Sequence, residues 1–114
     1  MDISARIERA HNDGLALTLS RTTLTVPASA AEELIEALSE EDPKRDPDGF
    51  HSIEWDAHGN LRLLLINFRP NRPITIYAEP FIVRITPSEA ERARIAIRAA
   101  LLQHDEQTAW EAKS

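Results

Sequence analysis

The side chains best suited to chemistry in this sequence are histidines and carboxylates that occur close together. His11 and Asp13 are separated by one residue, as are Asp56 and His58, and both pairs fall where turns are expected. A metal site needs three or four convergent ligands, and each pair supplies only two. We therefore predict no metal site and no cofactor.

Glu54 and Asp56 are the best candidates for acid–base chemistry, because residues two apart on a strand share a face. His58 is the nearest further titratable group. The three glycines stand alone, so there is no phosphate-binding loop, and no serine or threonine lies in a nucleophile-elbow motif. Exposed strand carboxylates are usually plain solvent-facing residues, and we do not expect an enzyme.

The segment Arg69-Pro70-Asn71-Arg72-Pro73 presents two arginines on a loop stiffened by two prolines. Guanidinium groups grip carboxylate or phosphate through two parallel hydrogen bonds, and a stiff loop loses little entropy on binding. Arg69 and Arg72 are therefore candidates for binding a small anionic ligand. The alternative is a surface connector whose arginines pair with acidic residues of the same chain.

Length and composition narrow the class of protein. A chain of 114 residues fits one domain, 1–114, and the lack of cysteine excludes disulfides and thiolate chemistry. A net charge of −6 argues against direct binding to nucleic acid, which depends on lysine and arginine. No apolar run approaches the ~20 residues needed to cross a bilayer, and the start lacks the apolar core of a signal peptide. We expect a cytoplasmic protein without a membrane segment.

The negative charge is concentrated in residues 28–60, which hold ten acidic and two basic residues. Most such runs are solvated helix faces. An acidic surface can also steer a basic partner toward its binding site. The candidate partner-binding residues in this run are Glu32, Glu33, Glu36, Glu40, Glu41 and Asp42.

Alternating apolar and polar residues predict strands, and capping motifs predict the helix starts. The expected strands are 3–9, 15–19, 22–26, 50–57, 61–68, 74–78 and 81–85. Helices are expected at about 29–40, opened by the spacing Ser29 to Glu32, and 87–103, opened by Thr86-Pro87-Ser88-Glu89. Helices that follow runs of strands predict an α+β fold with a mainly antiparallel sheet of about six to seven strands.

Three segments connect or end these elements. Residues 41–49 combine Pro43, Pro47 and Gly49 with charges and are expected to form an exposed loop. Residues 104–114 are expected to fray, unless Trp110 docks part of the tail. Between strands 50–57 and 61–68, turn chemistry leaves open a two-residue Gly59-Asn60 loop and a three-residue loop.

The strand at 61–68 is apolar on both faces. Leu61, Leu63 and Leu65 share one face, and Leu64, Ile66 and Phe68 share the other. A strand of this kind is normally covered on both sides. The helices can cover one face, and the other needs either the N-terminal hairpin or another protein. For the second case, Leu64, Ile66 and Phe68 are the predicted apolar interface, with a homodimer or a partner protein.

These observations favour a small noncatalytic protein-binding module of the inhibitor, immunity-type or adaptor kind. It would act by occluding a partner surface, with the acidic residues steering the encounter and an apolar patch supplying affinity. The alternative is a small domain that binds an anionic ligand through Arg69 and Arg72.

Overall fold

The computed structural model describes residues 2–8 and 14–113, with side chains described as far as residue 106. Strands β1 (Ile3–Glu8), β2 (Gly14–Leu19) and β3 (Thr22–Pro27) form one antiparallel sheet, in that order. Helix α1 (Ala28–Ala37) precedes a second antiparallel sheet of β4 (Phe50–Ala57), β5 (Asn60–Asn67), β6 (Ile74–Ala78) and β7 (Phe81–Ile85). Helix α2 (Pro87–Lys113) ends the described chain. The α+β class, with two helices and seven antiparallel strands, confirms the prediction, but the strands form two sheets.

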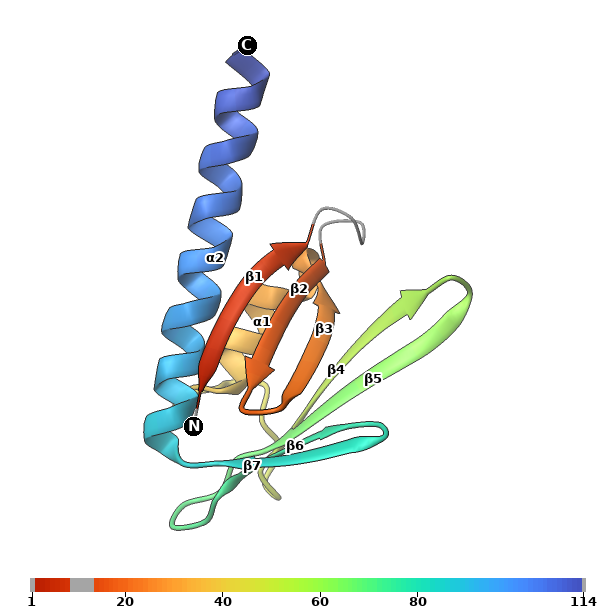
Figure 1. The fold of residues 1–114 in the computed structure, drawn as a ribbon. Coiled ribbons are helices and arrows are strands. Elements are labelled where there is room, and N and C mark those ends of the chain that lie inside the picture. The colour runs from red at the N-terminus through yellow and green to blue at the C-terminus, as the bar shows by residue number, and fades with distance from the viewer. Residues whose placement is uncertain (1, 9–13, 114) are drawn as a thin grey trace.

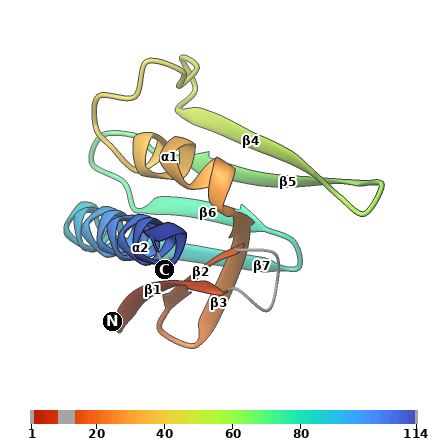
Figure 2. The same ribbon diagram turned by 90° about the horizontal axis from the view of Figure 1, so that it is seen from above.

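The helices join the two sheets. Helix α1 packs on β2 and β3 of the first sheet and on β4 of the second, and it also contacts α2. Helix α2 lies alongside β1 and extends well beyond the sheet (Figure 1). Viewed along a perpendicular direction, α1 lies between the β4–β5 hairpin and the first sheet (Figure 2). Neither helix of the described chain is both long and apolar enough to span a bilayer.

One hydrophobic core fills the space between these elements. The first sheet contributes the buried side chains on the helix-facing side of β2 and β3, and both helices contribute mainly alanine, leucine and isoleucine. From the second sheet come the side chains of one face only: Ile53, Leu64, Ile66, Ile74, Ile76 and Ile85. Burial of these branched side chains supplies most of the stability of such a domain, at roughly 25 cal/mol per Å² of apolar surface.

The start of α2 has the predicted capping box. The Glu89 N–H donates to Thr86 Oγ1 at 3.1 Å, and the Thr86 N–H donates to Glu89 Oε1 at 2.8 Å. Two backbone donors that the helix leaves free are thereby satisfied. The bond from the Thr86 backbone holds the pKa of Glu89 below its ordinary value. The helix extends to Lys113, beyond the predicted residue 103. The side chain of Trp110, which was expected to dock part of the tail, lies outside the described side chains.

The Thr86→Ala variant tests this cap. We expect the free energy of unfolding to fall by ~1 kcal/mol, the usual cost of removing a threonine N-cap. Ser88→Ala is the matched control, because it also removes an exposed hydroxyl from the first turn. The two capping hydrogen bonds join Thr86 and Glu89 and do not involve the Ser88 hydroxyl. Equal denaturation midpoints for the two variants would show that the cap contributes nothing.

The predicted capping box of α1 is wrong. The helix begins at Ala28, with Pro27 at the N-cap and no side-chain cap hydrogen bond, so Ser29 already lies inside the first turn. The physical reason is that Pro27 ends β3 in an extended conformation and turns the chain directly into the helix. The helix also ends at Ala37, short of the predicted residue 40, with Leu38 as its C-cap.

The turn between β4 and β5 has neither of the two registers considered from sequence. Ala57 pairs with Asn60, which leaves His58 and Gly59 as the two-residue loop. Both have positive φ, 54° and 83°, as the favoured type I′ hairpin turn requires. Asp56 Oδ1 accepts a hydrogen bond from the Gly59 N–H at 3.0 Å, which favours this register.

Candidate functional site

The second sheet has one face that no other part of the described chain buries. Along β5 this face carries Leu61, Leu63 and Leu65, and the register places Leu65 beside Tyr77 of β6, which lies beside Ile82 of β7. Leu61 is 73% exposed, Leu63 50% and Ile82 59%. We call these five residues the outer apolar face. Contiguous exposed apolar side chains on a small domain are typical of interaction sites.

The predicted apolar interface lies on the opposite face of β5. Leu64 and Ile66 are fully buried in the chain's own core, and Phe68 is partly buried against it. The helices therefore cover the face that was expected to bind a partner. The uncovered face is the one with Leu61 and Leu63, so an apolar contact through this sheet has to use those side chains.

Two carboxylates border the outer apolar face on β4. Glu54 pairs in register with Leu63, and Asp56 pairs with Leu61, so each carboxylate lies next to an exposed leucine on the same face. Both acidic residues are exposed. This arrangement is an apolar surface with an acidic border. It brings together two carboxylates that were considered for acid–base chemistry and a strand that was considered for an apolar contact.

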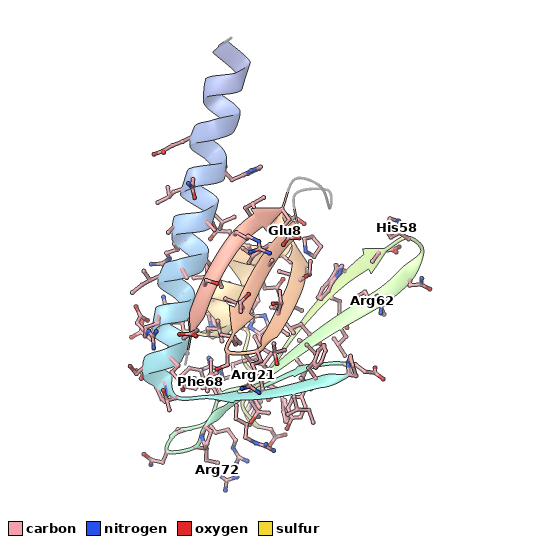
Figure 3. All side chains as sticks on the ribbon, in the orientation of Figure 1. Glu8, Arg21, His58, Arg62, Phe68 and Arg72 are labelled. Carbon is pink, nitrogen blue, oxygen red and sulfur yellow. The ribbon has the colours of Figure 1, made fainter. Side chains whose placement is uncertain are left out.

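Glu54 and Asp56, with His58, are also the acid–base groups considered from the sequence. His58 lies at the free end of the β4–β5 hairpin, together with Arg62 (Figure 3). Asp56 is engaged in the turn through Gly59. Among the described side chains of residues 2–8 and 14–106, no three histidine or acidic groups converge as a metal ion would require. The predicted turn pair of His11 and Asp13 lies outside the described residues.

The acidic residues of segment 28–60 do not form one continuous surface. Glu32, Glu40 and Glu41 are exposed, and Glu36 is half-buried. Glu33 and Asp42 are instead bonded to His51, whose side chain is almost fully buried. The loop 41–49 is accordingly anchored at Asp42 and is exposed only in part. The two carboxylates bonded to His51 are not available as simple steering charges.

His51 bridges three elements of the fold. Its Nδ1 bonds to Asp42 Oδ2 from the loop after α1, and its Nε2 lies 3.0 Å from Glu33 Oε1 of α1. Burial alone would lower the pKa of His51, but the hydrogen bonds and charges of Glu33 and Asp42 outweigh it and raise the pKa above its ordinary value. The sequence indicated this site through one signal: His51 shares the alternating apolar face with Ile53 and Trp55.

Arg45 fixes the loop that carries Asp42. Its guanidinium donates to the backbone carbonyls of Ala37, Ser39 and Glu40, which are left free at the end of α1. The same group lies 4.4 Å from the centroid of the Phe68 ring, a cation–π contact that ties the loop to the second sheet. Because these bonds use the Arg45 guanidinium, it serves as a structural clamp between α1 and the second sheet.

The predicted anion-binding loop lies at the other end of the second sheet from His58 (Figure 3). Arg69 and Arg72 are exposed, and both line a groove of about 630 Å³ together with Glu40 and Arg45. Glu40 places a carboxylate in this groove, which opposes an anionic ligand, and Arg45 is already bonded to backbone carbonyls. The geometry therefore supports this site less well than it supports the outer apolar face.

A second hollow lies between the two sheets. This cleft has a volume of about 900 Å³ and is lined by β3 on one side and by the free ends of the β4–β5 and β6–β7 hairpins on the other. The hairpins separate because β5 and β6 pair only at residues 65–67 of β5 (Figure 1). Its far wall is largely apolar and contains Trp55, Leu64 and Phe81 together with Leu61, Leu63, Leu65 and Tyr77, so the cleft adjoins the outer apolar face.

Comparisons with protein-family models, with characterised proteins and with solved structures found no match to this chain. Its function therefore has to be inferred from the geometry of the chain itself.

Proposed function

We propose that this protein is a noncatalytic protein-binding module, of the inhibitor, immunity-type or adaptor kind, that covers the surface of a partner protein. The observation that carries the proposal is the outer apolar face. Four of its five side chains are more than one-third exposed, and they come from three adjacent strands. Apolar side chains clustered on one face of a sheet supply affinity when a partner excludes water from them.

The border of this face indicates the chemistry of the partner. Glu54 and Asp56 lie directly beside Leu63 and Leu61, and the whole chain has a net charge of −6. A partner surface with apolar side chains bordered by lysine or arginine would match both properties. Complementary charge at the border of an interface accelerates the encounter, while the apolar centre slows dissociation. The exposed acidic residues of α1 and its following loop, including Glu40 and Glu41, add to the negative charge of the chain.

The test is affinity capture from an extract of the source cells with the wild type and the double variant Leu61→Gln/Leu63→Gln. We expect the variant to bind the captured partner about thirtyfold more weakly, since a loss of ~1 kcal/mol for each of the two leucines lowers the binding free energy by ~2 kcal/mol in all. Folding should be nearly unchanged, because exposed substitutions usually alter stability by no more than about 0.5 kcal/mol.

The matched control is Ile95→Gln/Leu102→Gln, which removes two comparably exposed apolar side chains from α2. It should bind the partner like the wild type. Equal binding by both double variants would contradict the proposal. Light scattering of the pure wild type shows whether the partner is a second copy of this chain, because a homodimer through this face would dissociate in the first variant only.

Charge variants of the same protein separate steering from affinity. Glu54→Lys should lower the association rate and leave the dissociation rate almost unchanged. The triple variant Glu36→Lys/Glu40→Lys/Glu41→Lys measures the contribution of the helix and loop in the same way. Reversal of Arg69 and Arg72 should have little effect on partner binding, whereas a larger effect from this pair would favour the anion-binding alternative.

A further inference from the structure

Strand β3 is an open edge of the first sheet. The strand order is β1-β2-β3, and the two-residue turn after Leu19 makes Leu19 and Thr22 a hydrogen-bonded pair. Alternation along the ladder then directs the backbone groups of Thr22, Leu24 and Val26 toward β2. The hydrogen bond from the Ser20 N–H to the Asp2 carbonyl supports this assignment. It indicates that the even-numbered residues of β2 direct their backbone groups toward β1, so that the odd-numbered ones face β3. The N–H and C=O of Thr23 and Thr25 therefore point away from the sheet.

This edge lacks the features that usually protect an exposed strand. Residues 22–27 carry no charged side chain, and the register with β2 is continuous, without a bulge. Proteins commonly protect edge strands with lysine, with inward-pointing charges or with bulges that twist the edge away. Pro27 is the only interruption, and it lies at the last residue of the strand.

The free edge forms one wall of the cleft between the two sheets. Five consecutive residues of β3, 23–27, line the cleft. The facing wall contains Trp55, Leu64 and Phe81, together with four residues of the outer apolar face: Leu61, Leu63, Leu65 and Tyr77. Phe81 is 49% exposed. A strand added beside β3 would lie about 4.8 Å from it, and its alternate side chains would point to the two sides of the sheet. The volume of about 900 Å³ lies within the range of ordinary ligand sites.

Charged side chains at the mouth of the cleft give it a preference for a basic ligand. Asp56 lies near the tip of one hairpin and Glu79 at the tip of the other, and both line the cleft, whereas Arg62 is the single arginine there. Carboxylates on both tips favour a lysine or arginine in the bound segment. A second copy of this chain would have to bring an entire sheet to this edge. A single extended strand needs only the width of the cleft, so it is the better match.

We propose that the cleft binds an extended peptide segment of a partner protein, which adds a fourth strand to the free edge of β3. Backbone hydrogen bonds to Thr23 and Thr25 give affinity, and apolar side chains at alternate positions, with a basic residue nearby, give specificity. This inference rests on the proposed function, since it assumes a protein partner. Leu61, Leu63, Leu65 and Tyr77 of the outer apolar face also line the cleft, and what the inference adds is the free edge of β3.

The probe is a phage-displayed library of random linear peptides, selected on the full chain. The strongest binder is then synthesised and measured against Thr25→Pro and its matched control Thr25→Val. Proline removes the outward N–H of Thr25 without breaking a bond to β2, and valine keeps that N–H. We expect Thr25→Pro to weaken binding about tenfold and Thr25→Val to change it less than about twofold.

A second measurement uses the wild type, so that it does not depend on the folding of the proline variant. Hydrogen exchange followed by NMR should show the Thr23 and Thr25 amides slowing on addition of the peptide, while the Thr22 and Leu24 amides, already bonded to β2, change little. A library without enriched peptides, equal affinities for the proline and valine variants, or unchanged exchange at Thr23 and Thr25 would each overturn the inference. Peptide binding that is lost in Leu61→Gln/Leu63→Gln and kept in Thr25→Pro would overturn it while supporting the proposed function.

Discussion

Replacement of His51 by leucine is expected to lower the free energy of unfolding by ~3 kcal/mol, because it leaves the buried Asp42 carboxylate without its main partner. The side chain of Asp42 is fully buried, and apart from His51 it accepts the Lys44 N–H at 3.0 Å and lies 4.0 Å from Arg45. Glu33 is one-third exposed and can turn to water. Chemical denaturation at pH 6 measures the change.

The pH dependence of this effect has a definite sign. The pKa of His51 is raised in the folded chain, so the folded state holds this proton more tightly than the unfolded state does. The stabilisation is fully present below about pH 6.5, the ordinary pKa of histidine, and is lost as the pH rises through the raised value. We expect the free energy of unfolding of the wild type to decline above about pH 6.5, and the His51→Leu variant to lack this decline.

His58→Asn is the control for the histidine, because it replaces an exposed turn histidine by a residue that tolerates positive φ. It should retain the wild-type decline with pH. The double variant His51→Leu/Asp42→Leu should lose less stability than the two single variants together, since it leaves no buried charge unpaired. A decline with pH that persists in His51→Leu would show that another group is responsible.

Gly49→Ala is the second substitution with a large expected effect, about 2–3 kcal/mol of destabilisation. Gly49 has φ +90°, and a Cβ there would lie 2.8 Å from the Phe68 carbonyl oxygen and 2.6 Å from Arg69 Cγ. The arginine side chain can move, but the Phe68 carbonyl belongs to the backbone beside β5, and the Gly49 carbonyl accepts the Phe68 N–H at 2.8 Å. The methyl group would force these two segments apart.

Gly59→Ala separates backbone strain from close contact. Gly59 has nearly the same φ, +83°, but a Cβ there would meet nothing within 4 Å. Its substitution should cost ~1 kcal/mol from the strained conformation alone. The difference between the two alanine variants measures the contact at Gly49. Equal losses in thermal or chemical denaturation would show that the approach of Phe68 is easily relieved.

Features that depend on neighbours in sequence could be predicted here. The strand positions followed from alternation, and the start of α2 followed from the spacing of Thr86 and Glu89, which bond across three residues. The predicted start of α1 was wrong, although Ser29 and Glu32 have the same spacing as Thr86 and Glu89. Spacing indicates only which bonds can form, and Pro27 had already fixed the point at which the chain turns.

Features that depend on segments distant in sequence could not be predicted. The sequence showed that strand 61–68 is apolar on both faces, but the face that the helices cover is decided by how β5 packs in three dimensions, and Leu64 and Ile66 proved to be the buried side. The pairing of His51 with Glu33 joins residues 18 positions apart. A histidine on an otherwise apolar strand face was a signal that polar partners were needed, although not of which carboxylates supplied them.

The division of the strands into two hairpins has a mechanical consequence. Only three residue pairs connect β5 to β6, so the second sheet is two two-stranded ribbons joined along a narrow strip near the core. An isolated two-stranded ribbon is only marginally stable in water. We therefore expect the ends that carry Leu61 and Phe81 to move relative to each other at a small cost in free energy, whereas Leu64 and Ile66 are buried in the core and hold the strip in place. Under the proposed function, the partner would contact two hairpins joined to one fixed strip, and we expect this surface to adapt to partners of different thickness.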